Sequence, residues 1–169
     1  MVLAFLLTAH AGTDRPAHST GPLPAVTVAA PPSPDAAAQA ACVRVFAKLP
    51  VQLGDLAPRR TDTDSSFVAA WGDPAIVLRC GVARPALLGS PQAAQLLDVN
   101  GVIWQPDPQR NATVYTAVDR SVYLEVTVPA GADQPLPELA PAVQALPQRC
   151  TATDAAGHTT NPKLPVCGS

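Results

Sequence analysis

Ala69-Ala70-Trp71-Gly72-Asp73-Pro74-Ala75-Ile76-Val77-Leu78-Arg79-Cys80-Gly81-Val82 is the stretch that decides the fold of this chain. Its Gly-Asp-Pro tripeptide predicts a turn, because proline fixes its own φ and keeps the preceding residue out of the helical region. After the turn, apolar residues alternate with the period of a half-buried strand. Leu78 and Cys80 fall on the apolar face and Arg79 on the other. The stretch therefore predicts a turn followed by a strand over 75–82.

The length of 169 residues is typical of one domain with tails. Its formal net charge of -2 gives no sign of a nucleic-acid-binding surface. The four cysteines have no CxxC spacing, and an even cysteine number in an exported chain is typical of two disulfides, with three possible connectivities.

The N-terminal residues indicate export. Residues 1–11 are mostly apolar but too short to span a bilayer, which needs about 20 apolar residues. They end in Ala9-His10-Ala11, which fits a signal-peptide cleavage site. We interpret residues 1–11 as the remnant of a signal peptide or membrane anchor, with a short hydrophobic N-terminus of no export role as the alternative. Residues 12–33 are a Pro/Ala-rich linker. The predicted location is extracytoplasmic: secreted, or anchored to the cytoplasmic membrane by the N-terminus.

Two amphipathic helices are expected at the two ends of the domain, which we place at 34–150, followed by a C-terminal tail over 151–169. The first begins at Ser33-Pro34, with serine as N-cap and proline at the first helical position. Its apolar stripe includes Cys42, and Pro50 ends it. The second covers 136–146.

The sequence between the helices is rich in alternating strands. Residues 112–118 and 121–128 form a hairpin across a tight Asp119-Arg120 turn. Residues 98–104 form one strand, or a strand entered from the Asn100-Gly101 turn, and the prolines at 106 and 108 should end it. We therefore predict an α+β fold: an antiparallel sheet of four to five strands with two helices on one face.

The cysteines can be paired from their positions. Cys42 lies on the apolar stripe of the first helix and Cys80 on the apolar face of its strand, so a helix packed on the sheet brings them together. The remaining pair, Cys150 and Cys167, would fasten the tail to the end of the second helix.

The candidate binding residues lie near the turn and on the outward face of the sheet: Trp71, Asp73, Arg79, Tyr123 and Glu125. If the apolar strand faces pack on the helices, Arg79, Tyr123 and Glu125 share the opposite face, and Tyr115 joins them from the neighbouring strand. The alternative assigns Trp71 to the core and leaves an ordinary surface pair of Arg79 with Glu125, contributing about 0–1 kcal/mol.

Several chemistries are excluded by the residues present. None of the three histidines lies between Cys42 and Cys150, where a catalytic triad or a zinc site would need one, and no phosphate-binding loop occurs. Asp62 and Asp64 form an Asp-x-Asp pair, but the rest of a calcium-binding loop is missing. We expect no cofactor and no metal. A carboxylate pair for an enzyme can be drawn from Asp73 and Glu125.

The motifs Ala-Ala-Trp-Gly-Asp-Pro (69–74), Leu-Arg-Cys-Gly-Val (78–82), Gly-Val-Ile-Trp (101–104) and Arg120 with Tyr-Leu-Glu-Val-Thr-Val-Pro (123–129) resemble an actinobacterial family catalogued as a domain of unknown function, with mycobacterial members especially similar. The resemblance covers roughly residues 35–147. It implies an exported or single-span membrane protein with a small extracytoplasmic domain, and it implies no activity and no catalytic residues.

Three functions remain in order of preference. The first is a non-catalytic envelope module that binds a protein or cell-wall component and touches the membrane only through its N-terminal segment. The second is an enzyme acting on a cell-envelope substrate through a carboxylate and arginine site, which requires Asp73, Arg79 and Glu125 to converge in one pocket. The third is a purely structural domain held on the membrane.

Overall fold

A computed structural model describes residues 22–32, 35–92 and 94–149 of the chain. Its elements, in chain order, are α1 Ala36–Phe46, β1 Pro58–Arg59, β2 Val68–Trp71, β3 Ile76–Cys80, β4 Leu97–Val99, β5 Val102–Pro108, β6 Ala112–Ala117, β7 Leu124–Pro129 and α2 Leu136–Val143. The strands form one antiparallel sheet in the order β1-β2-β3-β7-β6-β5-β4. The α+β class is confirmed, and the sheet has seven strands where four or five were predicted.

The additional strands are short ones at the two sides of the sheet. β2 pairs with β3 across the Gly72-Asp73-Pro74 turn, and β1 adds two residues beyond it. β4 pairs with β5 across Asn100-Gly101, whose positive φ values of 50° and 73° suit a tight hairpin. Strands of two to four residues are too short to show a period in the sequence, which is why the predicted sheet had fewer strands.

β5 continues through two prolines that were expected to end it. Gln109 N–H donates to Ala112 O (2.8 Å), so odd-numbered residues of this strand direct their main-chain groups toward β6. Pro106 and Pro108 therefore occupy positions whose missing N–H would point away from β6. The pairing with β4 ends at Trp104, so no ladder bond is lost there.

The first helix begins at a different cap from the one predicted. Asp35 is the N-cap of α1, and its side chain accepts a hydrogen bond from Ala38 N–H at 2.8 Å. An aspartate at this position satisfies one of the free amides of the first turn as well as a serine would. The predicted apolar stripe is present, because Ala41, Cys42 and Val45 are all buried.

Both helices share one core with one face of the sheet. The largest fully buried side chains come from α1, α2 and alternate positions of the strands, and include Trp104, Ile76, Leu78, Leu124 and Leu139. The predicted Cys42–Cys80 disulfide is confirmed and joins α1 to β3 inside this core. The other predicted bridge, Cys150–Cys167, lies outside the described residues.

The cross-strand register shows which residues lie on the opposite, outer face. Arg79 of β3 is directly across from Glu125 of β7, and both alternate with buried neighbours. Tyr115 was expected on this face, and that prediction is wrong. Its cross-strand partner is Val126, and the ring packs against the core. Opposed residues of an antiparallel pair share a face, so Tyr115 belongs to the helix side.

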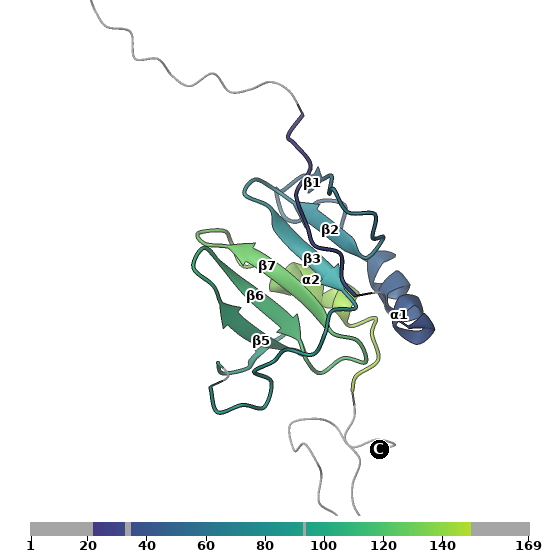
Figure 1. Cartoon of the computed structure of the whole chain (residues 1–169), viewed down its shortest axis with the longest axis vertical. Coiled ribbons are helices and arrows are strands. Elements are labelled where there is room, and N and C mark those ends of the chain that lie inside the picture. The colour runs from purple at the N-terminus through teal and green to yellow at the C-terminus, as the bar shows by residue number, and fades with distance from the viewer. Residues whose placement is uncertain (1–21, 33–34, 93, 150–169) are drawn as a thin grey trace, which may run out of the picture.

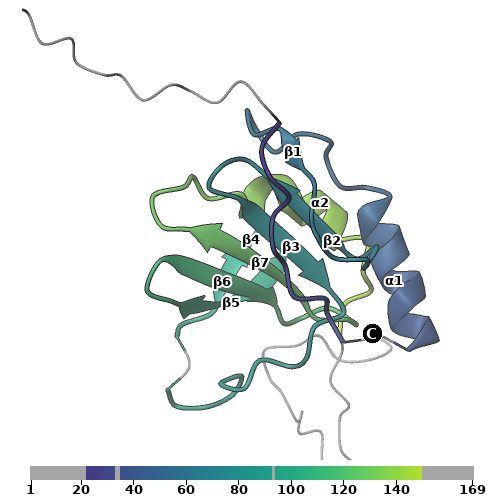
Figure 2. The ribbon, with the colours of Figure 1, turned by 45° about the horizontal axis from the view of Figure 1, so that its top comes forward.

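The N-terminal part of the described chain crosses the outer face. Residues 22–32, which we call the strap, run in front of β2 and β3, on the side of the sheet opposite α2 (Figures 1 and 2). Val26 forms a parallel bridge with Thr61, just beyond β1. Composition alone assigns these residues to a linker, but they lie against the domain. Within the described ranges, neither helix is long and apolar enough to cross a membrane.

Candidate functional site

Trp71 lies in the core. Its side chain is at the end of β2, and the residue is only 2% exposed. The indole N–H donates to Val51 O at 3.2 Å, which satisfies the one polar group of the buried ring. The geometry agrees with the packing interpretation of this residue.

Arg79 and Glu125 share the outer face, as their alternation predicted. The guanidinium reaches Glu125 Oε1 through Nε (2.7 Å) and Nη2 (2.5 Å), and the two side chains are 25% and 14% exposed. The third nitrogen, Nη1, donates to Ala29 O of the strap at 2.9 Å. Glu125 therefore orients Arg79 so that one N–H group faces the strap.

Asp73 takes part in a similar arrangement at the other end of the strap. Its exposed carboxylate lies 3.5 Å from Nη1 of Arg59, whose side chain is only 10% exposed. The same nitrogen donates to Gly72 O at 2.6 Å. Nη2 of Arg59 donates to Pro24 O of the strap at 2.9 Å. A second arginine is thus fixed by the domain and directs one N–H group to a strap carbonyl.

Asp62 and the main chain around it hold the middle of the strap. Val26 N–H donates to Arg60 O (2.8 Å), and Asp62 N–H donates to Val26 O (3.1 Å). Val28 N–H donates to Asp62 Oδ1 at 2.9 Å. This bond, together with one from the Thr27 side chain, lowers the pKa of Asp62 below its ordinary value.

These contacts form a cradle, which we define as Arg59, Arg60, Asp62 and Arg79. It bonds five main-chain groups of the strap, namely the carbonyls of Pro24, Val26 and Ala29 and the amides of Val26 and Val28. The strap sequence contains no charged residue. The arrangement therefore holds the backbone of this extended, uncharged segment against the sheet.

Tyr123 lies outside the cradle. It precedes β7, and the Arg149 guanidinium lies over its ring, 4.5 Å from the centroid. Nε of Arg149 also donates to Arg120 O at 3.2 Å, so the cation is held in place. One face of the tyrosine ring is covered by this contact.

The carboxylates of the enzyme hypothesis do not converge. Asp73 lines a hollow of about 470 Å³ together with Asp55, Asp133 and Glu138. Glu125 is paired with Arg79 under the strap, away from this hollow. Glu138 already accepts a hydrogen bond from Gly54 N–H at 2.6 Å. In the described part of the chain, no three His, Cys, Asp or Glu side chains are placed to hold a metal ion.

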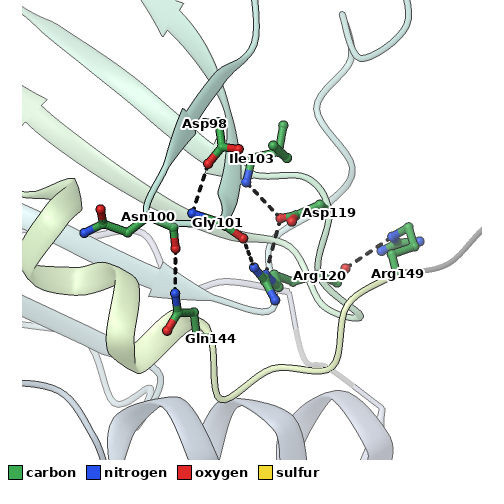
Figure 3. A network of polar contacts seen from close by, with 8 residues as sticks. All are labelled: Asp98, Asn100, Gly101, Ile103, Asp119, Arg120, Gln144 and Arg149. Carbon is green, nitrogen blue, oxygen red and sulfur yellow. Dashed lines mark hydrogen bonds and ion pairs between the residues drawn. The ribbon is translucent and has the colours of Figure 1, made fainter. Parts of the chain in front are cut away.

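A second polar cluster is buried at the opposite end of the sheet (Figure 3). Asp119 and Arg120 are 1% and 6% exposed, although the sequence places them in a turn. Asp119 Oδ1 accepts a hydrogen bond from Ile103 N–H at 3.1 Å and lies 3.4 Å from Arg120 Nε. Arg120 Nη2 donates to Gly101 O. This cluster fastens the β4–β5 turn to the loop between β6 and β7.

The sequence did not indicate the parts of the cradle that come from β1 and the loop after it. Arg59 and Arg60 were not among the candidate binding residues, Asp62 was considered only as part of an Asp-x-Asp pair, and the strap was assigned to a linker. One signal was present in the strap itself: Val26, Thr27 and Val28 alternate as in a short strand, and in the structure the two valines are half-buried while Thr27 is exposed. Arg120 and Asp119 gave no signal of burial, because turn residues are usually solvated.

The chain matches the family model described as Protein of unknown function (DUF3515) over residues 1–151, and it belongs to that family. No curated protein matches the chain, and no solved structure does either. The resemblance seen in the sequence is confirmed as a domain of unknown function, whereas the actinobacterial origin and the export remain predictions.

Proposed function

We propose that this member of the DUF3515 family is an extracytoplasmic module of the cell envelope that binds a protein partner and performs no catalysis. The observation that supports this most is the cradle, in which Arg59, Asp62 and Arg79 are arranged to hold the main chain of an extended segment. Such an arrangement provides recognition, and it presents no activated nucleophile or acid–base pair.

The location is supported by the cysteine chemistry. Cys42 and Cys80 are fully buried and bonded to each other. Disulfides of this kind persist in oxidising compartments and are rare in reducing ones. The signal-like residues 1–11 support the same location independently.

The preference for binding over catalysis follows from how the candidate residues are paired. Glu125 holds Arg79, and Asp73 lies beside Arg59, so both carboxylates balance arginines that donate to the strap. The pocket that the enzyme hypothesis requires would bring Asp73, Arg79 and Glu125 together around a substrate. The paired arrangement serves a docking surface instead.

Site-specific photo-crosslinking in the native envelope tests the binding function. A photoreactive residue at Thr27, which is exposed on the strap, should yield a discrete adduct with a protein partner. The same probe at Arg44, which is exposed on α1, is the matched control and should yield none. Absence of any adduct above background at Thr27 and at other outer-face positions would reject the binding function.

The location has its own test. A reporter enzyme that matures only outside the cytoplasmic membrane, fused after the domain, should be active. Non-reducing peptide mapping of the native protein should find Cys42 joined to Cys80. An inactive reporter together with free Cys42 and Cys80 would place the protein in a reducing compartment and contradict the proposal.

A further inference from the structure

We infer that the cradle is a peptide-binding site and that the strap is its exchangeable occupant. The external ligand is an extended, uncharged segment of small residues and prolines, supplied by a partner protein. This inference rests on the proposed binding function and names the chemistry of the partner. It follows from how the cradle is built, how it recognises the strap, and how weakly the strap is anchored.

The cradle is preorganised by the domain. Arg79 is bonded to Glu125 through Nε and Nη2, which leaves Nη1 directed at the strap. Arg59 is bonded to Gly72 O, which leaves Nη2 directed at the strap. Each guanidinium is a planar fork, so bonds on one side fix the direction of the donors on the other. A site whose donors are already oriented loses little freedom when a ligand binds.

Recognition works through the backbone of the occupant. Between Pro24 and Ala29, five main-chain groups are bonded to the cradle. An extended chain of six residues covers about 20 Å at ~3.3 Å per residue. The cradle should therefore accept different ligand sequences, because every peptide offers the same main-chain carbonyls and amides. The limit is steric, because the side chains of the ligand must be small enough to fit where those of the strap lie.

The strap is held in a way that permits exchange. Its exposed positions include Leu23, Thr27 and Ala29, and Pro31 is the residue of the strap that is buried. Hydrogen bonds between protein groups contribute only about 0.5–1.5 kcal/mol each, because water competes for both partners. The strap therefore occupies the cradle chiefly through its attachment to the domain, which gives it an effective concentration in the millimolar range. A ligand of matching chemistry competes with that concentration.

Exchange can be measured with the full chain. A protease site inserted between Pro32 and Ser33 allows the folded, oxidised protein to be cut, so that all residues remain present while the strap is no longer covalently attached. The probe is a fluorescein-labelled peptide with the sequence of residues 22–32. We expect saturable binding by fluorescence anisotropy to the cut protein and at least tenfold weaker apparent binding to the uncut protein.

A second variant covers the case in which the cut protein unfolds. Val26→Pro in the uncut chain removes the amide that donates to Arg60 O and changes no residue of the domain core. It should open the cradle and admit the labelled peptide. Arg79→Lys in the same background should weaken peptide binding about five- to tenfold, because lysine lacks the planar fork that bonds Glu125 on one side and fixes the direction of the donor to the strap on the other. Arg44→Lys, on exposed α1, is the matched control and should leave binding unchanged.

Two results overturn the inference. If neither the cut protein nor the Val26→Pro variant binds the peptide while both keep the circular dichroism of the parent, the strap is a fixed part of the fold. If light scattering shows dimers in which the strap of one copy crosslinks to the cradle of another, the occupant is a second copy and the partner-peptide assignment is wrong. Crosslinking from Thr27 in the envelope reports on the proposed function separately, since a partner can bind the outer face without displacing the strap.

Discussion

Two arginine–carboxylate pairs in this domain have opposite roles. Arg79 of β3 and Glu125 of β7 are paired on the outer face and are partly exposed, and Arg79 donates one N–H group to Ala29 O of the strap. Asp119 and Arg120 are neighbours in sequence and almost completely buried, and they bond the main chain of β5 at Ile103 and of the β4–β5 turn at Gly101. The chemical groups are the same, but Arg79 with Glu125 holds the strap, which is not part of the sheet. Asp119 with Arg120 holds parts of the sheet together.

Burial decides what each pair does. A buried ion pair loses so much solvation that it is stable only when both partners and their hydrogen bonds are in place. A partly exposed pair loses less, so its bonds to the strap can form and break without unfolding the domain. We therefore expect substitutions in the buried pair to affect global stability and substitutions in the exposed pair to affect docking of the strap.

The largest loss of free energy of unfolding is expected for Asp119→Ala. The substitution leaves Arg120 buried without its counter-charge and removes the acceptor of Ile103 N–H. Breaking a buried pair by removing one partner typically costs about 3–5 kcal/mol. Urea denaturation followed by circular dichroism measures the loss. Asp133→Ala, at an exposed position, is the control, and an equal effect of both substitutions would contradict the assigned role of the buried pair.

Arg79→Ala should reduce the stability of the whole domain less than Asp119→Ala does, but it should release the strap. Loss of the pair with Glu125 and of the bond to Ala29 O should lower the free energy of unfolding by about 1–2 kcal/mol. The strap should become accessible to proteases at concentrations that leave the domain uncut. Limited proteolysis with mass spectrometry locates the cleavage. If the domain and the strap are digested together, the two regions are not separable as we describe.

Acid should loosen the strap through Asp62. Hydrogen bonds from Val28 N–H and the Thr27 side chain lower the pKa of this carboxylate in the docked state. A group with a lowered pKa contributes stability at pH values above its ordinary value of 3.8, and this contribution is lost as the pH falls through the docked-state pKa. The strap should therefore be fully docked at pH 6 and progressively released below about pH 4.

The pH dependence is measured by the rate of proteolysis or exchange within the strap at several acid pH values. In the Asp62→Asn variant the strap should be looser at neutral pH, and its docking should no longer vary through this range. A pH dependence unchanged by Asp62→Asn would assign the effect to another group.

The smallest effect is expected for Tyr123→Leu. The substitution removes the ring under the Arg149 guanidinium, a contact that typically contributes about 0.5–1 kcal/mol at a partly exposed site. The strap should remain docked, because Tyr123 lies outside the cradle. Thermal denaturation measures the loss of stability, and limited proteolysis shows whether the strap stays docked. Release of the strap by this substitution would extend the docking surface beyond the residues we assign to it.

The strands with strong periodicity were predictable from the sequence. The alternation in β3 and β7 placed Arg79 and Glu125 on one face, and the apolar stripe of α1 placed Cys42 near Cys80. These features depend on local patterns and on the rule that apolar faces pack together. Tyr115 was misplaced because the register between strands, which decides its face, is set by the turn and not by the composition of the strand.

The cradle was less predictable because its contacts are to main-chain atoms. Every sequence offers carbonyls and amides, so the alternation at residues 26–28 suggests an extended segment but does not indicate that Arg59 and Asp62 will bind it. The burial of Asp119 was not predictable for a related reason. It depends on the path of the chain after α2, where Arg149 N–H donates to Asp119 O in the folded domain. Three of the five candidate residues, Asp73, Arg79 and Glu125, do lie at or beside the cradle.

Amide hydrogen exchange within the strap tests the central claim most directly. The cradle account predicts that the amides of Val26 and Val28, which donate to Arg60 O and Asp62 Oδ1, exchange more slowly than in an unstructured peptide of the same sequence. Arg79→Ala should remove this protection while the amides of β7 stay protected. Exchange of Val26 and Val28 at the rate of the free peptide in the unmodified protein would contradict the account.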